Sequence, residues 1–208
     1  MRTSSATIRK CQGEKITNSV ILLAFGANLP VDVASGEQLP AETIALSLVD
    51  LSGAGFRLRR FSRLYATPCF PSGTGPDYVN AAAVFEAGPD LTPDSILAAL
   101  HRVEAAHGRR RSTRWAGRTL DIDLLAIGDT VRPDLRGFLH WQRLAPVDQA
   151  RLAPDRLILP HPRLAERAFV LVPLAEVAPD WRHPVLGQTV AQMRDALPPA
   201  DLAAIHLL

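Results

Sequence analysis

The chain has 208 residues, of which 47% are hydrophobic and 21% charged, so it is long enough for one well-cored domain. Its net charge of +2 is too small to indicate general nucleic-acid binding. Cys11 and Cys69 supply neither a disulfide framework nor a metal-ligand spacing. We expect neither a signal peptide nor a membrane span, because 1–18 is polar and basic and no apolar run reaches roughly 18 to 20 residues. We therefore expect a cytoplasmic protein with a disordered leader at 1–18 and a single domain at 19–208.

The first half of the chain predicts strands that alternate with one helix. The apolar run 20–25 predicts a buried strand that ends in a turn at Gly26-Ala27-Asn28. Apolar residues then recur at helical spacing from Pro40 to the glycines at 53 and 55. Segment 56–65 alternates apolar and basic residues like a half-exposed strand, a loop rich in Pro and Gly spans 67–76, and 78–85 predicts the next strand.

The second half predicts a further helix and strand before less regular segments. Thr92 and Pro93 form a good helix start, and an apolar stripe continues to Gly108. The apolar residues of 120–127 predict a buried strand, a strand resumes at 157–159, residues 169–177 form a helix or extended segment, and a short helix lies near 190–197. The order βαββαβ predicts an α+β fold, namely a ferredoxin-like core whose antiparallel sheet lies in an α/β/α sandwich with C-terminal additions.

Residues 132–154 interrupt this pattern. Apolar residues are scattered among Pro, Arg and Asp without a sustained period. We expect a surface insertion near the functional centre but not within it, whose deletion would leave turnover largely intact. Long loops serve as lids or partner contacts, and a poorly ordered insertion is an equal alternative.

The most informative segment is 108–123, where five arginines precede two aspartates. Asp121 and Asp123 lie two apart in the predicted strand, so both side chains point to the same face. Two strand positions advance roughly 6 to 7 Å, which suits a pair of divalent cations about 3.5 to 4 Å apart. Arginine forks bind phosphate oxygens and stay charged. The pattern therefore predicts a polyphosphate held with magnesium.

Other interpretations of this segment remain open. Arginine runs are often only solvated loops, although aspartates within an apolar strand need a reason that packing does not supply. The arginines with Trp115 would suit an RNA- or DNA-binding module, but neighbouring carboxylates would repel a phosphate backbone without metals. A metal-dependent nuclease and a catalytically weakened homologue kept for binding are the remaining alternatives.

Five motifs in order give the chain a family resemblance. They are Phe-Gly-Ala-Asn-Leu at 25–29, Ser-Arg-Leu-Tyr-Ala-Thr-Pro at 62–68, Pro-Asp-Tyr-Val-Asn-Ala at 76–81, Arg-Thr-Leu-Asp-Ile-Asp at 118–123 and Leu-Pro-His-Pro-Arg-Leu-Ala-Glu-Arg-Ala-Phe-Val at 159–170. With these motifs the chain closely resembles the 6-hydroxymethyl-7,8-dihydropterin pyrophosphokinase family. The resemblance covers about residues 20–183 and implies a folate-pathway enzyme that transfers pyrophosphate from ATP to the pterin, giving AMP and the pterin diphosphate.

The resemblance also implies roles for individual residues. Asp121 and Asp123 would coordinate two Mg²⁺ ions that bridge the ATP phosphates. The catalytic set would be Arg109, Arg111, Arg118, Asp121 and Asp123. The ATP-binding set would be Glu104, Arg109, Arg114, Trp115, Arg118, Ile122, His161 and Arg167. The pterin-binding set would be Thr67, Pro68, Phe70, Tyr78, Asn80, Trp115 and Phe169.

Some positions depart from the family pattern. The arginine loop is one residue shorter than in the best-known members, Ala116-Gly117 replaces Gly-Pro, Cys69 replaces a proline, and Ala27 replaces a serine. His101 and His107 have no implied role, and we expect them to be surface or partly packed residues. No P-loop sequence is present, so the arginines would hold the phosphates. ATP and the pterin would be the only partners, without nucleic acid or membrane, for a monomer or weak dimer.

Overall fold

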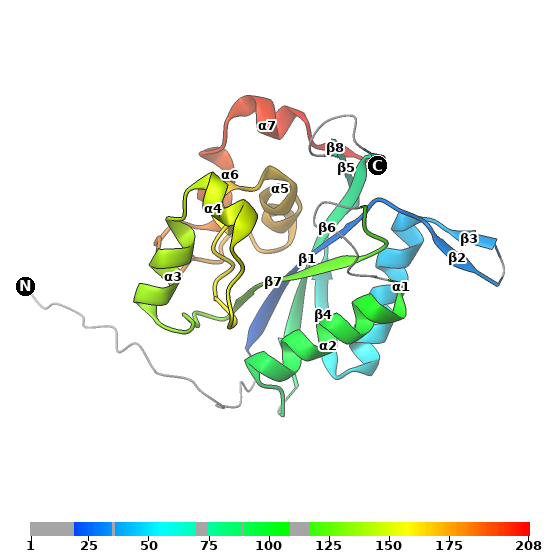
Figure 1. Cartoon of the computed structure of the whole chain (residues 1–208), viewed down its shortest axis with the longest axis horizontal. Coiled ribbons are helices and arrows are strands. Elements are labelled where there is room, and N and C mark those ends of the chain that lie inside the picture. Colours follow the sequence, from blue (N-terminus) through cyan, green and yellow to red (C-terminus); the bar gives the residue numbers. More distant parts are fainter. Residues whose placement is uncertain (1–18, 35, 70–74, 89, 109–116) are drawn as a thin grey trace, which may run out of the picture.

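The computed structural model describes residues 19–34, 36–69, 75–88, 90–108 and 117–208, so the expected leader at 1–18 lies outside it. Its main sheet contains six strands, which are β1 (Val20–Ala27), β4 (Phe56–Phe61), β5 (Tyr65–Thr67), β6 (Tyr78–Ala87), β7 (Asp121–Ile127) and β8 (His206–Leu207). The strand order is β7-β1-β6-β5-β8, β4 also pairs with β6, and every pairing is antiparallel. Two short strands, β2 (Val31–Val33) and β3 (Gly36–Gln38), form a separate antiparallel pair that projects from the body (Figure 1).

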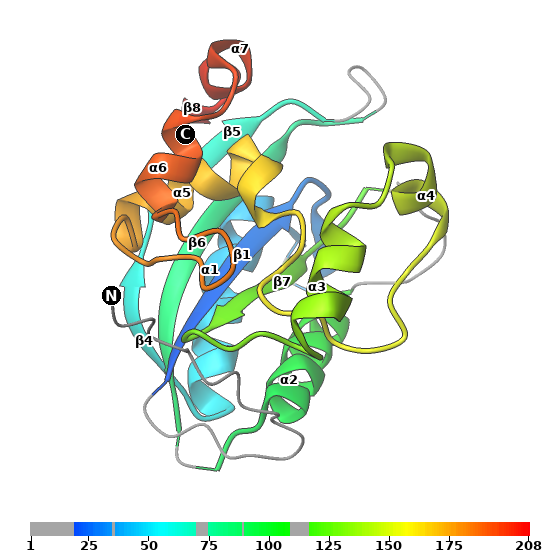
Figure 2. The same cartoon turned by 90° about the vertical axis from the view of Figure 1, so that its left-hand side faces the viewer.

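Helices cover both faces of the sheet (Figures 1 and 2). On one face, α1 (Pro40–Gly53) and α2 (Pro93–Ala106) contribute to a core with Ile21, Leu23 and Phe25 of β1. On the other face, α5 (Ala168–Val177) and α6 (Val190–Asp195) share a second core with Leu22 and Ala24. The protein is therefore a mixed α/β fold with a central antiparallel sheet.

The alternation of side chains along the strands explains the two cores. Because neighbouring residues of a strand point to opposite faces, the continuous apolar run of β1 supplies both layers. The start of α2 follows the sequence signal, because the Thr92 hydroxyl accepts a hydrogen bond from the Ser95 amide at 3.2 Å and the Ser95 hydroxyl accepts one from the Thr92 amide at 2.8 Å. Segment 169–177 was expected to be either a helix or an extended segment, and it is helical.

Two expectations about extended segments were only partly right. Segment 56–65 is not one strand, because β4 ends at Phe61 and β5 begins at Tyr65. The Ser62 hydroxyl accepts a hydrogen bond from the Ala82 amide at 2.9 Å between them, which takes the place of a ladder bond. The expected strand at 157–159 is reduced to a single antiparallel bridge between Leu159 and Arg132.

The expectation of an irregular insertion at 132–154 was wrong in one respect. The segment folds into two short helices, α3 (Leu135–Gln142) and α4 (Pro146–Arg151). The Asp134 side chain begins α3 by accepting a hydrogen bond from the Gly137 amide at 2.8 Å, a local capping signal that does not depend on a long apolar period. The remaining elements are a 3-10 turn at Leu164–Glu166 and α7 (Pro199–Ala203).

Candidate active site

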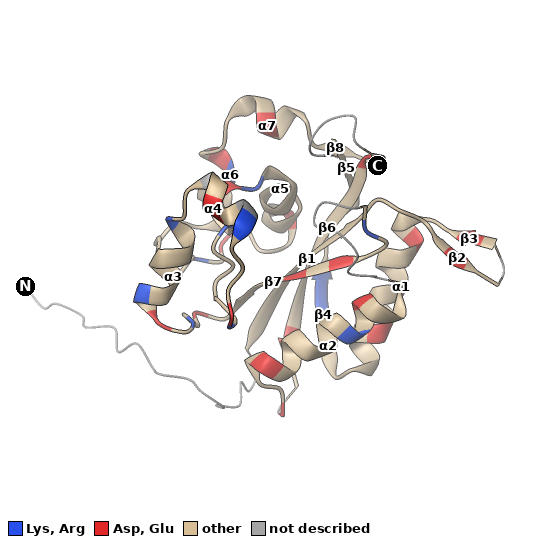
Figure 3. Ribbon diagram, in the orientation of Figure 1, with Lys and Arg blue, Asp and Glu red and all other residues tan. Residues whose placement is uncertain are grey.

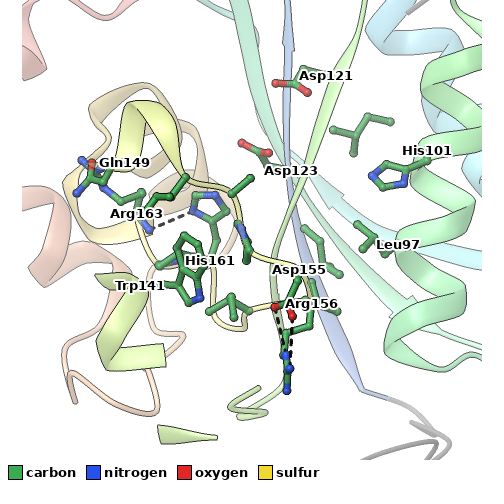
Figure 4. Close-up of a pocket in the computed structure, with 18 of the residues that line it drawn as sticks. Leu97, His101, Asp121, Asp123, Trp141, Gln149, Asp155, Arg156, His161 and Arg163 are labelled. Carbon is green, nitrogen blue, oxygen red and sulfur yellow. Dashed lines mark hydrogen bonds and ion pairs between the residues drawn. The ribbon is translucent and has the colours of Figure 1, made fainter. Parts of the chain in front are cut away.

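The carboxylate pair Asp121 and Asp123 lies at the start of β7, an edge strand of the sheet. Asp121 is opposite Gly26 and Asp123 is opposite Ala24 on β1, so both carboxylates project from the face that α5 covers. Figure 4 shows the two carboxylates turned to the same side of the strand. The predicted shared face of the pair is thus confirmed.

Each carboxylate has an arginine partner. Arg118 forms an ion pair with Asp121, and the Arg167 guanidinium lies 3.3 Å from an Asp123 oxygen. All four side chains are partly exposed to solvent, so these ion pairs remain accessible to a ligand. The arginines compensate the negative charge of the pair and are placed to contact an anionic group beside it.

The carboxylate pair on its own is an incomplete metal site. Among residues that the structure describes, no group of three or more His, Cys, Asp and Glu side chains gathers where it could hold an ion. Mg²⁺ is commonly held by one or two carboxylates together with water and substrate phosphates. The donor set therefore fits Mg²⁺ that arrives with a phosphate ligand.

The outer edge of β7 obtains its hydrogen bonds from other parts of the chain. Glu104 of α2, only 2% exposed, accepts a hydrogen bond from the Ile122 amide at 2.8 Å. On the same strand, Leu125 accepts one from the His161 amide at 2.7 Å. Glu104 and His161 therefore fix the edge strand, and with it the carboxylate pair, against α2 and the segment that precedes α5.

The His161 side chain is neutral. Burial and the nearby charges of Arg167 and Arg163 lower the pKa of His161 to about 3. Its Nδ1 accepts a hydrogen bond from the Arg163 amide at 3.2 Å. The remaining proton of the neutral ring is then on Nε2, so His161 offers a hydrogen-bond donor to a ligand.

Asn28 connects two loops next to the carboxylate pair. Its side chain accepts a hydrogen bond from the Arg118 amide at 2.8 Å and donates one to the Pro76 carbonyl at 3.0 Å. Its own amide donates to the Arg118 carbonyl at 2.9 Å. Because Asn28 is only 5% exposed, these hydrogen bonds are shielded from water, which gives the Phe-Gly-Ala-Asn motif a structural reason.

A small pocket of about 330 Å³ opens on one side of the carboxylate pair. Strands β1, β5 and β6 and the beginning of α5 supply its walls. Its lining consists of Ala24, Phe25, Gly26, Thr67, Pro68, Tyr78, Asn80, Arg118, Asp121, Asp123, Arg167 and Phe169. The lining thus combines aromatic rings with a few polar groups, which is typical of a site for a flat heterocycle.

Polar groups in the small pocket are fixed by neighbouring strands. The Asn80 amide group donates a hydrogen bond to the Thr67 hydroxyl at 2.7 Å, and both residues are buried. Gly26 lies opposite Asn80, and a Cβ atom on Gly26 would come within 3.1 Å of the Asn80 oxygen. Glycine at this position therefore leaves room for the Asn80 side chain. The amide group of Asn80 lines the pocket and can form further hydrogen bonds there.

Two aromatic residues complete the small pocket. Burial raises the pKa of the Tyr78 hydroxyl, so the phenol keeps its proton at neutral pH. Phe169 is 39% exposed despite its apolar ring, and the Arg167 guanidinium lies 5.6 Å from the ring centroid. An exposed ring at the wall of this pocket is available for stacking on a ligand.

A large pocket of about 980 Å³ lies on the other side of the carboxylate pair, beyond the edge of β7 (Figure 4). One wall is α2, with Leu97 and His101, and the opposite wall includes α3, α4 and residues 152–158. Arg118, Asp121, Asp123 and Arg167 line both pockets. The carboxylate pair with its two arginines is thus the boundary between two binding spaces.

The structure brings together most of the site residues expected from sequence. Thr67, Pro68, Tyr78, Asn80 and Phe169 line the small pocket, and Glu104, Ile122 and His161 line the large one. Five expected site residues lie outside the described residues, namely Arg109, Arg111, Arg114, Trp115 and Phe70, of which Trp115 and Phe70 were expected pterin contacts. Their roles remain predictions.

Several residues that line the large pocket were not expected from the sequence. His101 was given no role, yet it lies on the wall of the large pocket with Leu97. A signal existed, because 97, 101 and 104 follow the i, i+4, i+7 spacing of one helical face that includes Glu104. Arg163 and Trp141 also line this pocket, but no spacing in the sequence connects them to the carboxylate pair.

Cys69, which replaces a proline of the family pattern, forms a hydrogen bond of its own. Its thiol lies 3.0 Å from the Gly75 carbonyl oxygen.

Two carboxylates with arginine partners between two pockets are the arrangement expected of an enzyme that transfers a phosphorus-containing group between two bound substrates. The chain belongs to the 7,8-dihydro-6-hydroxymethylpterin-pyrophosphokinase (HPPK) family, whose model matches residues 22–179. This is a family of ATP-dependent diphosphokinases. All five motifs found in the sequence lie within the matched range.

Individual relatives agree with this family. The chain is 36% identical over 140 residues to a 2-amino-4-hydroxy-6-hydroxymethyldihydropteridine pyrophosphokinase of Synechocystis sp.. These aligned residues cover 67% of this chain and 60% of that protein. It is 32% identical to the protein of the same name from Haemophilus influenzae, with coverage of 83% and 92%. The chain therefore spans less than two thirds of the Synechocystis protein but nearly all of the Haemophilus one.

A solved structure supports the fold. Plasmodium falciparum HPPK-DHPS, in its wild-type form with SDX-DHP, superposes with a TM-score of 0.58 at 14% sequence identity. The match covers 88% of this chain and 45% of that one. Across the described residues, no helix is both long enough and apolar enough to cross a membrane.

Proposed function

We propose that the protein transfers the pyrophosphoryl group of ATP to 6-hydroxymethyl-7,8-dihydropterin, giving AMP and the pterin diphosphate. The observation that carries this proposal is the position of Asp121 and Asp123, with Arg118 and Arg167, at the boundary of the two pockets. Family membership supplies the identity of the two substrates. The reaction needs an acceptor and a polyphosphate donor whose reacting atoms meet at such a boundary.

The small pocket would take the pterin and the large pocket would take ATP. The polar edge of Asn80 and Thr67 suits the donors and acceptors of a pterin ring, and Tyr78 and Phe169 offer aromatic faces to it. The hydroxymethyl group would then point to the carboxylate pair. Its oxygen attacks the β-phosphorus, the bond from that phosphorus to the oxygen shared with the α-phosphorus breaks, AMP leaves, and the hydroxyl proton is released.

Asp121 and Asp123 would hold Mg²⁺ together with the ATP phosphates, and we propose two ions. Bound Mg²⁺ neutralises charge that develops on phosphate oxygens. Arg118 and Arg167 already contact these carboxylates, so a short movement would bring their guanidinium groups to the phosphates. Arg109, Arg111 and Arg114, with Trp115, are proposed to complete the phosphate contacts.

Two further residues would hold the strand and the nucleotide in place. Glu104 would orient Ile122 and the strand that carries the carboxylates, through its 2.8 Å hydrogen bond. His161, neutral with its proton on Nε2, would donate a hydrogen bond to the nucleotide. The phosphoryl-type transfer needs little covalent chemistry from the protein, so orientation and charge supply the rate enhancement.

Further proposals concern the fold and setting. The strand order β7-β1-β6-β4, with α1 and α2 on the same face of the sheet, supports a ferredoxin-like βαββαβ core, made of β1, α1, β4, β6, α2 and β7. Basic and acidic residues are interspersed over the described ribbon (Figure 3), and the net charge of the chain is only +2, which supports small-molecule substrates over nucleic acid. We propose a cytoplasmic protein that is a monomer or weak dimer.

The test is AMP formation from Mg-ATP with and without 6-hydroxymethyl-7,8-dihydropterin. Pterin-dependent AMP release would support the reaction and both substrates. Binding of ATP without turnover would instead identify a weakened homologue. If neither occurs, incubation with nucleic acid and Mg²⁺ would test the nuclease and nucleic-acid alternatives.

A further inference from the structure

We propose that the inserted helices α3 and α4, with residues 152–158, form a wall of the nucleotide site and set its affinity for ATP through Trp141. This inference rests on the proposed function, because it takes the large pocket as the ATP site. It replaces the expectation that segment 132–154 is a surface elaboration outside the functional centre. Trp141 is thereby a nucleotide-binding residue that the five motifs do not contain.

The wall and the carboxylate pair enclose one continuous space. Trp141 of α3, Gln149 of α4 and Leu152 line the same pocket as Asp121 and Asp123. In Figure 4, Trp141 and Gln149 lie across the pocket from α2. Without α3 and α4, this side of the pocket would be open to solvent, because the edge of β7 ends the sheet here.

The wall is fixed to the rest of the fold. Phe138 of α3 is 1% exposed, and its ring centroid lies 5.4 Å from that of buried His183. At the base of the insertion, Arg132 and Leu159 exchange backbone hydrogen bonds of 2.9 and 3.1 Å. Trp141 lies one helical turn after Phe138, so the anchor that positions Phe138 also positions Trp141. A wall held in this way is preformed and loses little freedom when a ligand binds.

The direction of the bound nucleotide follows from the two pockets. The phosphates must lie at the carboxylate pair, and the acceptor occupies the small pocket on one side of it. The nucleoside must therefore extend into the large pocket, between α2 and the wall that contains Trp141. A flat, electron-rich indole in a largely apolar wall is suited to contact a nucleobase or ribose.

The experiment measures binding of α,β-methylene-ATP with Mg²⁺ by isothermal titration calorimetry, on the full chain. Trp141→Ala should raise Kd about ten-fold, because it removes an aromatic contact together with its buried area. Trp141→Phe should restore most of the affinity. Val147→Ala is the matched control, since Val147 lies on α4, is 64% exposed and is not part of the pocket lining.

Steady-state kinetics give the second measurement. Trp141→Ala should raise KM for ATP and leave KM for the pterin within two-fold, which a general loss of structure would not do. Leu152→Ala, at a half-exposed position of the same wall, repeats the test if Trp141→Ala does not fold. If Trp141→Ala folds and its Kd for the analogue is within two-fold of the Kd of the unmodified protein, the proposal that this wall binds the nucleotide is refuted. If Trp141→Ala does not fold, the same result in Leu152→Ala refutes it.

Failure of the proposed function has a different signature. An unmodified protein that binds the analogue but releases no AMP in the presence of the pterin would refute the reaction. The calorimetric comparison of Trp141→Ala with Val147→Ala would still decide whether α3 forms part of a nucleotide site. An unmodified protein that does not bind the analogue would overturn both proposals.

Discussion

The small and large pockets share the carboxylate pair but are built in different ways. Strand register shapes the small pocket, since Asn80, Gly26 and Asp121 lie side by side on β6, β1 and β7. The large pocket lies beyond the sheet edge, and its shape depends on how α2 and the inserted helices dock. Geometry fixed by a hydrogen-bonded sheet is rigid, whereas geometry fixed by docked helices is easier to change without loss of the fold.

The largest expected effect is at the boundary that both pockets share. Asp123→Ala should lower kcat/KM about 1000-fold, because loss of a metal ligand removes several kcal/mol of charge stabilisation. The fold should persist, since the apolar residues of β7 remain. AMP release and thermal unfolding measure the two effects, with exposed Asp201→Ala as the control. Near-normal turnover in Asp123→Ala would refute the proposed role of the carboxylate pair.

The second prediction separates the small pocket from the large one. Asn80→Ala should raise KM for the pterin roughly 10- to 100-fold, because it removes ring-edge contacts and leaves the buried Thr67 hydroxyl without its 2.7 Å partner. KM for ATP should stay within two-fold. Steady-state kinetics with each substrate varied in turn test this, and Gln188→Ala removes an exposed amide as the control. An equal rise in both KM values would mean that the pockets are not separate.

A smaller effect is expected at the aromatic wall of the small pocket. Phe169→Leu keeps an apolar side chain but loses the ring, so affinity for the pterin should fall roughly 2- to 10-fold, as stacking contributes about 0.5 to 1.5 kcal/mol. Phe56→Leu is the control, because its ring packs against Phe85 with centroids 6.0 Å apart and neither residue is part of the pocket lining. Equal pterin affinity in both variants would show that Phe169 does not stack on the ligand.

The same contrast explains what the sequence could predict. The alternation of Asp121 and Asp123 with apolar residues sets their common face directly, and register then brings Asn80 and Gly26 beside them. The signals for the small pocket are therefore local motifs on strands. Thr67, Tyr78 and Asn80 were expected only from the family resemblance of the motifs at 62–68 and 76–81, and the pairing of β5 with β6 brings them together in the lining.

The large pocket was less predictable for a physical reason. Trp141 lines the large pocket only because Phe138 is buried against His183, 45 positions further along the chain. No periodic pattern in the sequence predicts such a contact. The two inserted helices are also short, so their apolar residues do not repeat often enough to be detected. Tertiary docking thus determines the wall, whereas local sequence determines the strands.

The last prediction concerns stability instead of activity and tests the anchor of that wall through pH. Burial lowers the pKa of His183 to about 4 from an ordinary value of 6.5, and its Nδ1 accepts hydrogen bonds from the Val185 and Leu186 amides at 3.2 Å. Between pH 6.5 and 4 the unfolded chain therefore binds a proton that the folded chain excludes, so stability falls as the pH falls.

The contribution of one such group is at most about 1.4 kcal/mol per pH unit in the free energy of unfolding. His183→Asn retains an acceptor but cannot titrate, so its urea unfolding should lose less stability between pH 6.5 and 5 than that of the unmodified protein. Exposed His206→Asn is the control and should keep the original slope. Equal slopes in all three proteins would show that His183 is not held neutral, and that Phe138 packs on a ring which tolerates charge.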